Sequence, residues 1–134
     1  LNHLNTTNTQ DMARLNAFIK SLPNWNALVP NGLGGIGTLI TAGSGTIDTT
    51  NYVASACTPD GSLLVAYMGT GWAGSTTFDM TKMRGTTTAR WFDPTNASYT
   101  NVAGQPFANT GTRAFTTPGN NSAGQADWVL RLDA

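Results

Sequence analysis

Hydrophobic and polar residues alternate along most of the chain beyond residue 34. In the last such stretch Trp128, Leu130 and Leu132 fall on one side, and the residues between them fall on the other. Alternation with a period of two is typical of a β-strand with one buried face. Clusters of Gly, Pro, Asn and Asp separate the alternating stretches. The pattern predicts strands at about 36–42, 51–58, 62–68, 75–80, 86–93, 97–102, 112–117 and 126–133.

Two of the predicted turns have clear sequence signals. Asp93-Pro94 starts a turn, because an Asp side chain accepts local backbone N–H bonds and proline fixes its own φ. Thr58-Pro59-Asp60-Gly61 combines proline at the second turn position with glycine at the fourth, which favours a hairpin. Short strands joined by such turns predict an all-β fold, an antiparallel β-sandwich of about eight strands.

A helical pattern precedes the predicted strands. Apolar residues recur every three or four positions there, at Met12, Leu15, Phe18, Ile19 and Leu22. Thr9 is the predicted N-cap, and Pro23 ends the pattern. We therefore expect one N-terminal α-helix with its linker over residues 1–30, and the β-sandwich domain over residues 31–134. Trp25 in the linker is expected to pack the helix onto the sandwich.

Composition narrows the possible partners. The chain has seven basic and seven acidic residues, and only 10% of its residues are charged. Because neither sign forms a run, we expect no nucleic-acid partner and no membrane partner. A charge-poor surface rich in Thr, Asn, Ser and Gly is common on secreted proteins, so the sequence predicts a secreted, monomeric domain. The single cysteine, Cys57, is expected to be buried and unreactive.

No catalytic set emerges from the sequence. A glycosidase needs two carboxyl groups that flank one bond. Asp60 and Asp93, however, lie in predicted turns, and Asp127 points away from the core in the last predicted strand. We interpret all three as structural. His3 is the only histidine, so neither a Ser-His-Asp triad nor a histidine zinc site can be assembled. The sequence predicts a domain that is not an enzyme and has no cofactor, with calcium as the weaker alternative at Asp48, Asp60 and Asp79.

Aromatic side chains are the remaining candidates for ligand binding. A pyranose ring stacks its C–H face on an aromatic ring, while polar side chains bond its hydroxyl groups. Trp72 is the first candidate, because it lies in a Gly-rich loop, and Tyr99 is the second. Asp79, Asn101 and Arg113 are the predicted polar partners of these rings. Four further aromatics lie within predicted strands and are assigned to the core, namely Tyr67, Phe78, Trp91 and Trp128.

Four segments, in this order, resemble a known family. They are residues 52–67 with the Pro59-Asp60-Gly61 turn, residues 89–94, residues 115–119 and residues 127–130. Together they are similar to the C-terminal β-sandwich called the putative collagen-binding domain of a collagenase. In apiosidase-like glycoside hydrolases this sandwich follows a (β/α)8 catalytic barrel. The resemblance covers about residues 33–133.

The resemblance implies a non-catalytic accessory domain of a glycoside hydrolase, whose catalytic carboxylates belong to the barrel. It also implies that the helix and linker over residues 11–30 are the end of that barrel, so the catalytic domain of the same polypeptide would be a partner. The family follows Asp-Pro with a pair ending in Gly, whereas this chain has Asn96-Ala97. We therefore expect Asn96 to adopt the left-handed conformation that glycine would supply.

Three functions stay open at this point. Binding of a polysaccharide or oligosaccharide is favoured by the neutral surface and the aromatic candidates. A structural cap on the catalytic barrel is favoured by the apolar side of the N-terminal helix. Collagen binding rests on the name of the family alone.

Overall fold

The computed structural model describes residues 7–69 and 74–134, with side chains from residue 13 onward. Within these residues one α-helix, α1 (Thr7–Ser21), precedes nine β-strands. Two single-turn helices interrupt the chain, η2 (Trp25–Ala27) and η3 (Met80–Lys82). The strands are β1 (Val29–Pro30), β2 (Ile40–Ala42), β3 (Val53–Cys57), β4 (Leu63–Met68), β5 (Ser75–Asp79), β6 (Thr88–Asp93), β7 (Ser98–Asn101), β8 (Thr112–Thr116) and β9 (Trp128–Asp133).

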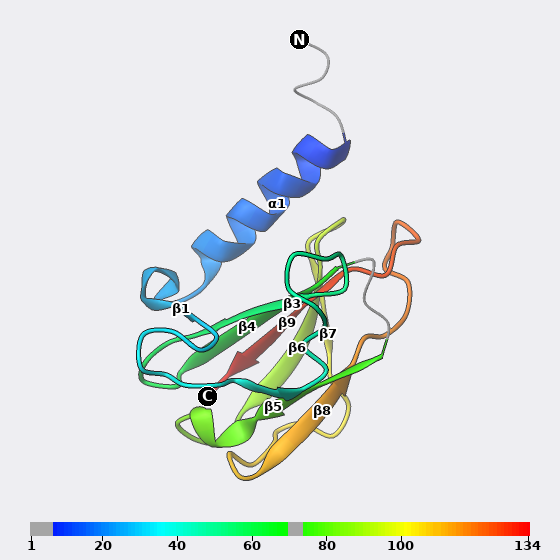
Figure 1. Ribbon diagram of the computed structural model, residues 1–134. Helices are drawn as coiled ribbons and strands as arrows, with labels where there is room; N and C mark the ends of the chain where they lie inside the picture. Colours follow the sequence, from blue (N-terminus) through cyan, green and yellow to red (C-terminus); the bar gives the residue numbers. More distant parts are fainter. Residues whose placement is uncertain (1–6, 70–73) are drawn as a thin grey trace.

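The strands form two sheets that pack against each other. The large sheet has the order β1-β3-β4-β9-β6-β7, and the small sheet has the order β2-β5-β8. All of their pairings are antiparallel. The small sheet covers one face of the large sheet, and α1 lies on the side of the other face (Figure 1). We call the face toward α1 the outer face of the large sheet. The all-β sandwich with one N-terminal helix is therefore confirmed.

The main core lies between the two sheets. Strands β4 and β9 contribute alternate residues to it, because successive side chains of a strand point to opposite faces. Edge-on aromatic pairs join neighbouring strands within each sheet, with ring centroids 5.9 Å apart for Phe78 and Phe115 and 6.5 Å apart for Trp91 and Trp128. Core members from β4, β6 and β9 include Leu64, Ala66, Met68, Ala89, Trp91, Trp128, Leu130 and Leu132.

A second apolar cluster lies on the outer face of the large sheet, beneath α1. Phe18 of α1 stacks on Phe92 of β6 with ring centroids 4.3 Å apart. Leu22, which directly follows α1, is also buried, and four sheet residues complete the buried part of the cluster, namely Leu63, Val65, Phe92 and Val129. Helix α1 therefore packs on the sheet through Leu15, Phe18 and Ile19, three of the predicted apolar positions, while the side chain of Met12 lies outside the described part. No helix in the described part of the chain is long and apolar enough to cross a membrane.

All eight predicted strands are present, and each is shorter than predicted. One strand was missed, since β1 forms within the expected linker and pairs with β3 through Val29 and Cys57. A strand of two residues is too short to show alternation, and Pro30 can join only because β1 lies at the sheet edge. The linker is thus part of the large sheet.

The two predicted turns form, with one correction. Gly61 has φ 70° and donates its N–H to the carbonyl of Thr58 at 3.0 Å, closing the β3–β4 turn. After Asp93, however, Ala97 takes the left-handed conformation with φ 62°, and the expectation for Asn96 was wrong. The Asn96 Oδ1 instead accepts the Ser98 N–H at 3.0 Å. This local bond uses the Asn side chain to build the turn.

Two aromatic assignments were also wrong. Tyr67 was assigned to the core, but it is 38% exposed on the outer face, because Ala66 and Met68 occupy the core positions on either side of it. Trp25 was expected to hold the helix onto the sandwich, but it is 45% exposed. Leu28 in the linker packs instead against the second apolar cluster, the one beneath α1.

We expect Ala97→Gly to stabilise the protein by about 0.5–1 kcal/mol, because glycine relieves the strain of a left-handed alanine. Ala97 is exposed, so the change removes no core packing. The denaturation midpoint in urea measures the effect. Ala103→Gly is the matched control, since Ala103 is exposed without a positive φ and should lose stability. A midpoint below that of the wild type for Ala97→Gly would contradict the interpretation.

Candidate functional site

The outer face of the large sheet changes from apolar to polar along its strands. On β6, Phe92 lies in the apolar cluster, whereas Arg90 and Thr88 follow it on the same face. On β9, Val129 lies in that cluster, whereas Arg131 and Asp133 follow it. Strand pairing brings the polar residues together, because Arg90 lies opposite both Arg131 and Asn101. We call this region the outer polar patch, made of Thr88, Arg90, Tyr99, Asn101, Arg131 and Asp133.

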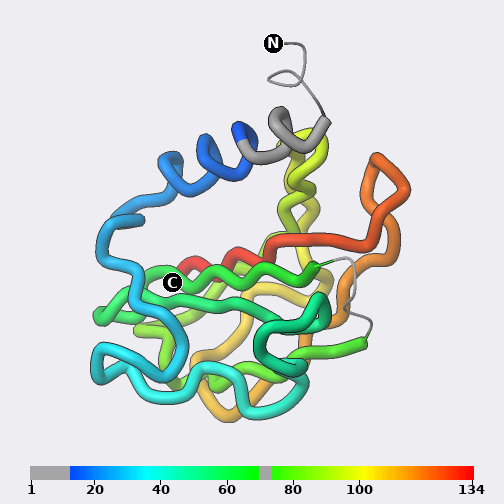
Figure 2. Tube along the Cα trace, turned by 45° about the horizontal axis from the view of Figure 1, so that its top comes forward, coloured from blue at the N-terminus to red at the C-terminus, as the bar shows by residue number. Residues whose placement is uncertain are grey.

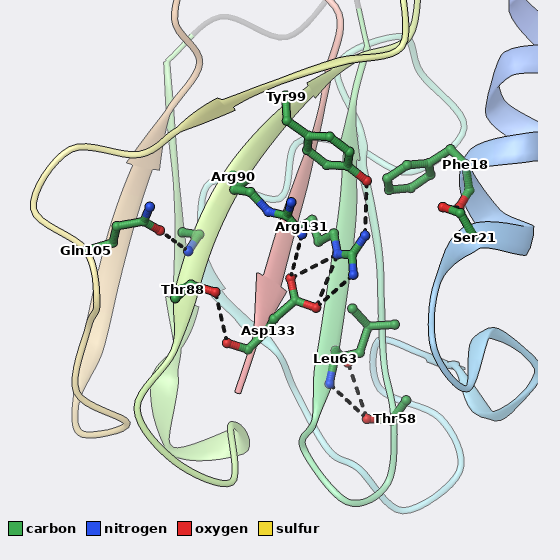
Figure 3. Close-up of polar contacts among 11 residues, drawn as sticks. Phe18, Ser21, Thr58, Leu63, Thr88, Arg90, Tyr99, Gln105, Arg131 and Asp133 are labelled. Carbon is green, nitrogen blue, oxygen red and sulfur yellow. Dashed lines mark hydrogen bonds and ion pairs between the residues drawn. The ribbon is translucent and has the colours of Figure 1, made fainter.

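Arg131 lies at the centre of the outer polar patch and is held from two sides. Its Nε is 2.9 Å from Oδ2 of Asp133 and its Nη2 is 3.0 Å from Oδ1, which makes a bidentate ion pair. Its Nη1 donates to the Tyr99 hydroxyl at 3.1 Å (Figure 3). Burial alone would lower the pKa of Arg131, but the hydrogen bonds to Asp133 and Tyr99 outweigh it and raise that pKa. Arg131 is therefore a fixed cation.

Arg90 lies beside Arg131 and stacks on Tyr99. The guanidinium carbon of Arg90 is 4.4 Å from the centre of the Tyr99 ring, a cation–π arrangement. Nη2 of Arg90 is 3.5 Å from Oδ2 of Asp133. Figure 3 shows both guanidinium groups approaching the one carboxylate. The Tyr99 ring thus has one face covered by Arg90, while Phe92 approaches it with centroids 5.2 Å apart.

The structure places the described candidates for ligand binding in two groups. Tyr99, 36% exposed, and the exposed Asn101 share the outer polar patch. Asp79 and Arg113 lie in the small sheet, on β5 and β8. The Asp79 carboxylate accepts the Thr81 N–H at 3.0 Å as a helix cap, and the Arg113 guanidinium lies 4.0 Å from the centre of the Phe107 ring. Trp72 lies outside the described residues.

Sequence reasoning missed four members of the outer polar patch, namely Thr88, Arg90, Arg131 and Asp133. Alternation places Arg90 on the same side of its strand as Phe92, and Arg131 on the same side as Val129. What the sequence does not contain is the pairing of β6 with β9, which are far apart in the chain. Only this pairing brings the two arginines together.

The three carboxylates considered for catalysis have local structural partners. Asp60 Oδ1 accepts the Ser62 N–H at 3.0 Å within its turn, and the hydrogen bonds from Ser62 are the main cause that lowers the pKa of Asp60 to about 2. The buried Asp127 accepts from the amide of Asn121 at 2.7 Å. These contacts, together with those of Asp93 below, agree with the structural roles assigned from the sequence. Among the described residues, no three His, Cys, Asp or Glu side chains are grouped to hold a metal ion.

Asp93 ties two segments together from a buried position. Its Oδ1 accepts the Thr95 N–H at 2.8 Å, and its Oδ2 accepts the Ser122 N–H at 2.9 Å. Burial would raise the pKa of Asp93, but the hydrogen bonds from Thr95 and Ser122 outweigh it and lower that pKa. The ionised carboxylate therefore connects the β6–β7 turn to the loop before β9.

Cys57 is buried in the main core, as expected. Burial is the main cause that raises the pKa of its thiol to about 11, and the nearby charge of Asp60 acts in the same direction. A thiol that stays protonated is a poor nucleophile.

Two hollows flank α1 on the outer face. The larger, of about 390 Å³, is lined by apolar side chains of α1 and of strands β3, β4 and β9, including Leu15, Ile19, Ala54, Val65, Tyr67 and Val129. The smaller, of about 260 Å³, lies between α1 and the β6–β7 turn and is lined by Arg14, Phe18 and Tyr99 among others. Figure 2 shows α1 running across the large sheet. Tyr99 belongs both to the smaller hollow and to the outer polar patch, so these two features adjoin.

Known proteins similar to this chain include one family and several solved structures. The sequence profile of the family described as the putative collagen-binding domain of a collagenase matches residues 39–133. A solved structure of a glycoside hydrolase is 20% identical, with a TM-score of 0.75, and the alignment covers 98% of this chain and 26% of that one. A glycoside hydrolase family 5 structure from Bacteroides vulgatus is 16% identical, with a TM-score of 0.74 and coverage of 98% and 25%. This chain thus spans about a quarter of their length, and no curated protein matches it.

We expect Asp93→Asn to reduce the acid sensitivity of the fold. Because the pKa of folded Asp93 is lowered, its carboxylate stabilises the fold above the ordinary Asp pKa of about 3.9, and this contribution is lost as the pH falls through the folded pKa. At pH 7 the variant should lose about 1.5–3 kcal/mol, the usual worth of a hydrogen bond to a charged group. Between pH 5 and pH 2 the variant should then lose less stability than the wild type.

Urea denaturation at several pH values between these limits measures both effects. Asp48→Asn is the matched control, since Asp48 is exposed in a loop. An unchanged dependence of stability on pH in Asp93→Asn would contradict the assigned role.

Proposed function

The chain belongs to the family described as the putative collagen-binding domain of a collagenase, and from this premise we propose that it is a non-catalytic accessory domain of a secreted glycoside hydrolase that binds polysaccharide. The two glycoside hydrolase structures that share this fold are about four times as long as this chain. They support an accessory role, because the chain would account for only a small part of such an enzyme.

The carboxylates support the non-catalytic part of the proposal. Asp60, Asp93 and Asp127 are each engaged by hydrogen bonds from neighbouring residues. Asp133 neutralises Arg131. A glycosidase would need two carboxyl groups that face one bond across about 5–9 Å, one of them protonated. In the part of the chain that the structure describes, these four carboxylates have other roles.

The outer polar patch carries the binding part of the proposal. It places Tyr99 beside Arg90 and Asn101 on one face of a sheet, where side chains stand in register. Guanidinium, amide and carboxylate groups can bond sugar hydroxyls, and the exposed part of the Tyr99 ring adds apolar contact for the sugar ring. A sugar chain on the patch would continue past Tyr99 into the smaller hollow beside α1.

One observation favours a structural cap as the second candidate. The larger hollow beside α1 is lined almost entirely by apolar side chains. An interdomain interface within one polypeptide would cover such a surface. The partner would then be the catalytic domain of the same polypeptide. Collagen binding has only the family description in its favour.

We expect the 134-residue chain to bind a polysaccharide saturably. Tyr99→Ala and Asn101→Ala should each weaken that binding by about tenfold, because each removes a contact worth about 1–1.5 kcal/mol. Affinity gels and calorimetry with a panel of plant and microbial polysaccharides measure this binding. The same measurements are made with a collagen peptide as the ligand, and with and without calcium. Trp72→Ala belongs in the same set, since it tests the first candidate from the sequence.

Trp25→Ala is the control for these variants, because Trp25 is an exposed aromatic on η2 that belongs to neither the patch nor the hollows. Binding that Tyr99→Ala and Asn101→Ala leave unchanged would remove the outer polar patch from the proposal. If the chain binds no glycan, the structural cap becomes the favoured function. If it binds the collagen peptide alone, collagen binding replaces both glycan binding and the cap.

A separate measurement tests the structural cap. In the full-length polypeptide, Ala54→Arg places a charge in the larger hollow, where Ala54 is exposed on β3, and should lower the melting temperature of the catalytic domain by several degrees. Ala108→Arg, at an exposed position away from this hollow, is the matched control. Equal melting temperatures for the two variants would speak against the cap.

A further inference from the structure

The outer polar patch carries more positive than negative charge. Arg90 and Arg131 lie directly opposite each other on adjacent strands, with their side chains on the same face. Like charges at such positions repel, and this destabilises a sheet unless something compensates them. Of the two compensating groups, only Asp133 carries a charge, since Tyr99 is a neutral ring. The group of Arg90, Arg131 and Asp133 therefore has a net charge of about +1 at neutral pH.

The single carboxylate serves Arg131 much more than Arg90. Both oxygens of Asp133 bond Arg131, at 2.9 and 3.0 Å, and the third nitrogen of Arg131 bonds the Tyr99 hydroxyl. The side chain of Arg131 is only 13% exposed. Arg131 thus has its charge neutralised, and each of its three side-chain nitrogens makes a hydrogen bond within the fold.

Arg90 keeps donors for a ligand. Its one polar contact among the described residues is the 3.5 Å approach of Nη2 to Asp133, which is long for a hydrogen bond. Its side chain is 32% exposed. Its guanidinium carbon lies over the Tyr99 ring, 4.4 Å from the ring centre. The result is a partly exposed cation stacked on Tyr99, with N–H groups that have no bond of ordinary length in the described part of the chain.

We propose that Arg90 binds a carboxylate of the ligand, so that the polysaccharide bound on the outer polar patch is an acidic one, built with uronic acid units. This inference rests on the proposed function. A carboxylate matches the planar fork of an arginine and would supply the negative charge that the patch lacks. A neutral sugar would leave the repulsion between Arg90 and Arg131 in place.

A pair of ligands that differ only in charge tests this proposal. Calorimetry compares a uronic acid oligosaccharide with its methyl ester, which has the same backbone but no charge. The wild-type chain should bind the acid at least tenfold more tightly than the ester, the range for hydrogen bonds to a charged group. Added salt should narrow that difference, because it screens the charge.

Three substitutions make the assignment specific to Arg90. Arg90→Gln should bring binding of the acid down to the level of the ester, and Arg90→Lys, which keeps the charge but not the fork, should fall between. Arg84→Gln is the matched control, since Arg84 is an exposed arginine that pairs with Asp60 at the β3–β4 turn. Thermal melting confirms that each variant is folded.

The outcomes separate this inference from the proposed function. Equal binding of acid and ester, or an unchanged preference for the acid in folded Arg90→Gln, overturns the carboxylate site and leaves glycan binding intact. Binding of neutral polysaccharides alone does the same. No binding of any glycan overturns both.

Discussion

The structure depends on the central strand β9, whose two faces serve different purposes. It lies between β4 and β6 in the large sheet, and it pairs with β4 along its whole length and with β6 from Val129 to Asp133. Its inner side chains, Trp128 and Leu130 among them, belong to the main core. Its outer side chains begin with Val129 under α1 and continue with Arg131 and Asp133 in the outer polar patch. One alternating segment therefore connects the sandwich, the helix and the candidate site.

Partial cover of the outer face is what creates the candidate site. Helix α1 buries one part of that face through Phe18, Leu22 just after the helix adds to this cover, and two hollows remain beside α1. Beyond the helix the strands carry charged and polar residues, so that end of the face remains favourable in water without a covering element. A ligand or a partner domain can approach there without displacing any part of the described fold. The two candidate functions use different parts of the same face, since the glycan would occupy the polar part and the catalytic domain the apolar part.

Much of the fold follows from local pattern, and the errors have local causes. Alternation predicted eight of the nine strands, and the turn at Gly61 formed as expected. The exchange of roles between Asn96 and Ala97 could not be predicted, because it depends on the Asn96 side chain bonding the Ser98 N–H. Tyr67 was misplaced because an aromatic within a strand was taken as buried, although its neighbours already filled the core side. Tyr67 therefore lies on the outer face of the large sheet.

The candidate site, like the fold, could be predicted from the sequence only in part. The sequence by itself determined the elements, the side of each strand on which a residue lies, and the presence of Tyr99 and Asn101 on a single strand, since period-two geometry is local. Only the tertiary structure decided that β6 and β9 are neighbours, and with that the pairing of Arg90 with Arg131 around Asp133. Strand order is set by burial of apolar faces across the whole domain, and no single segment contains that information.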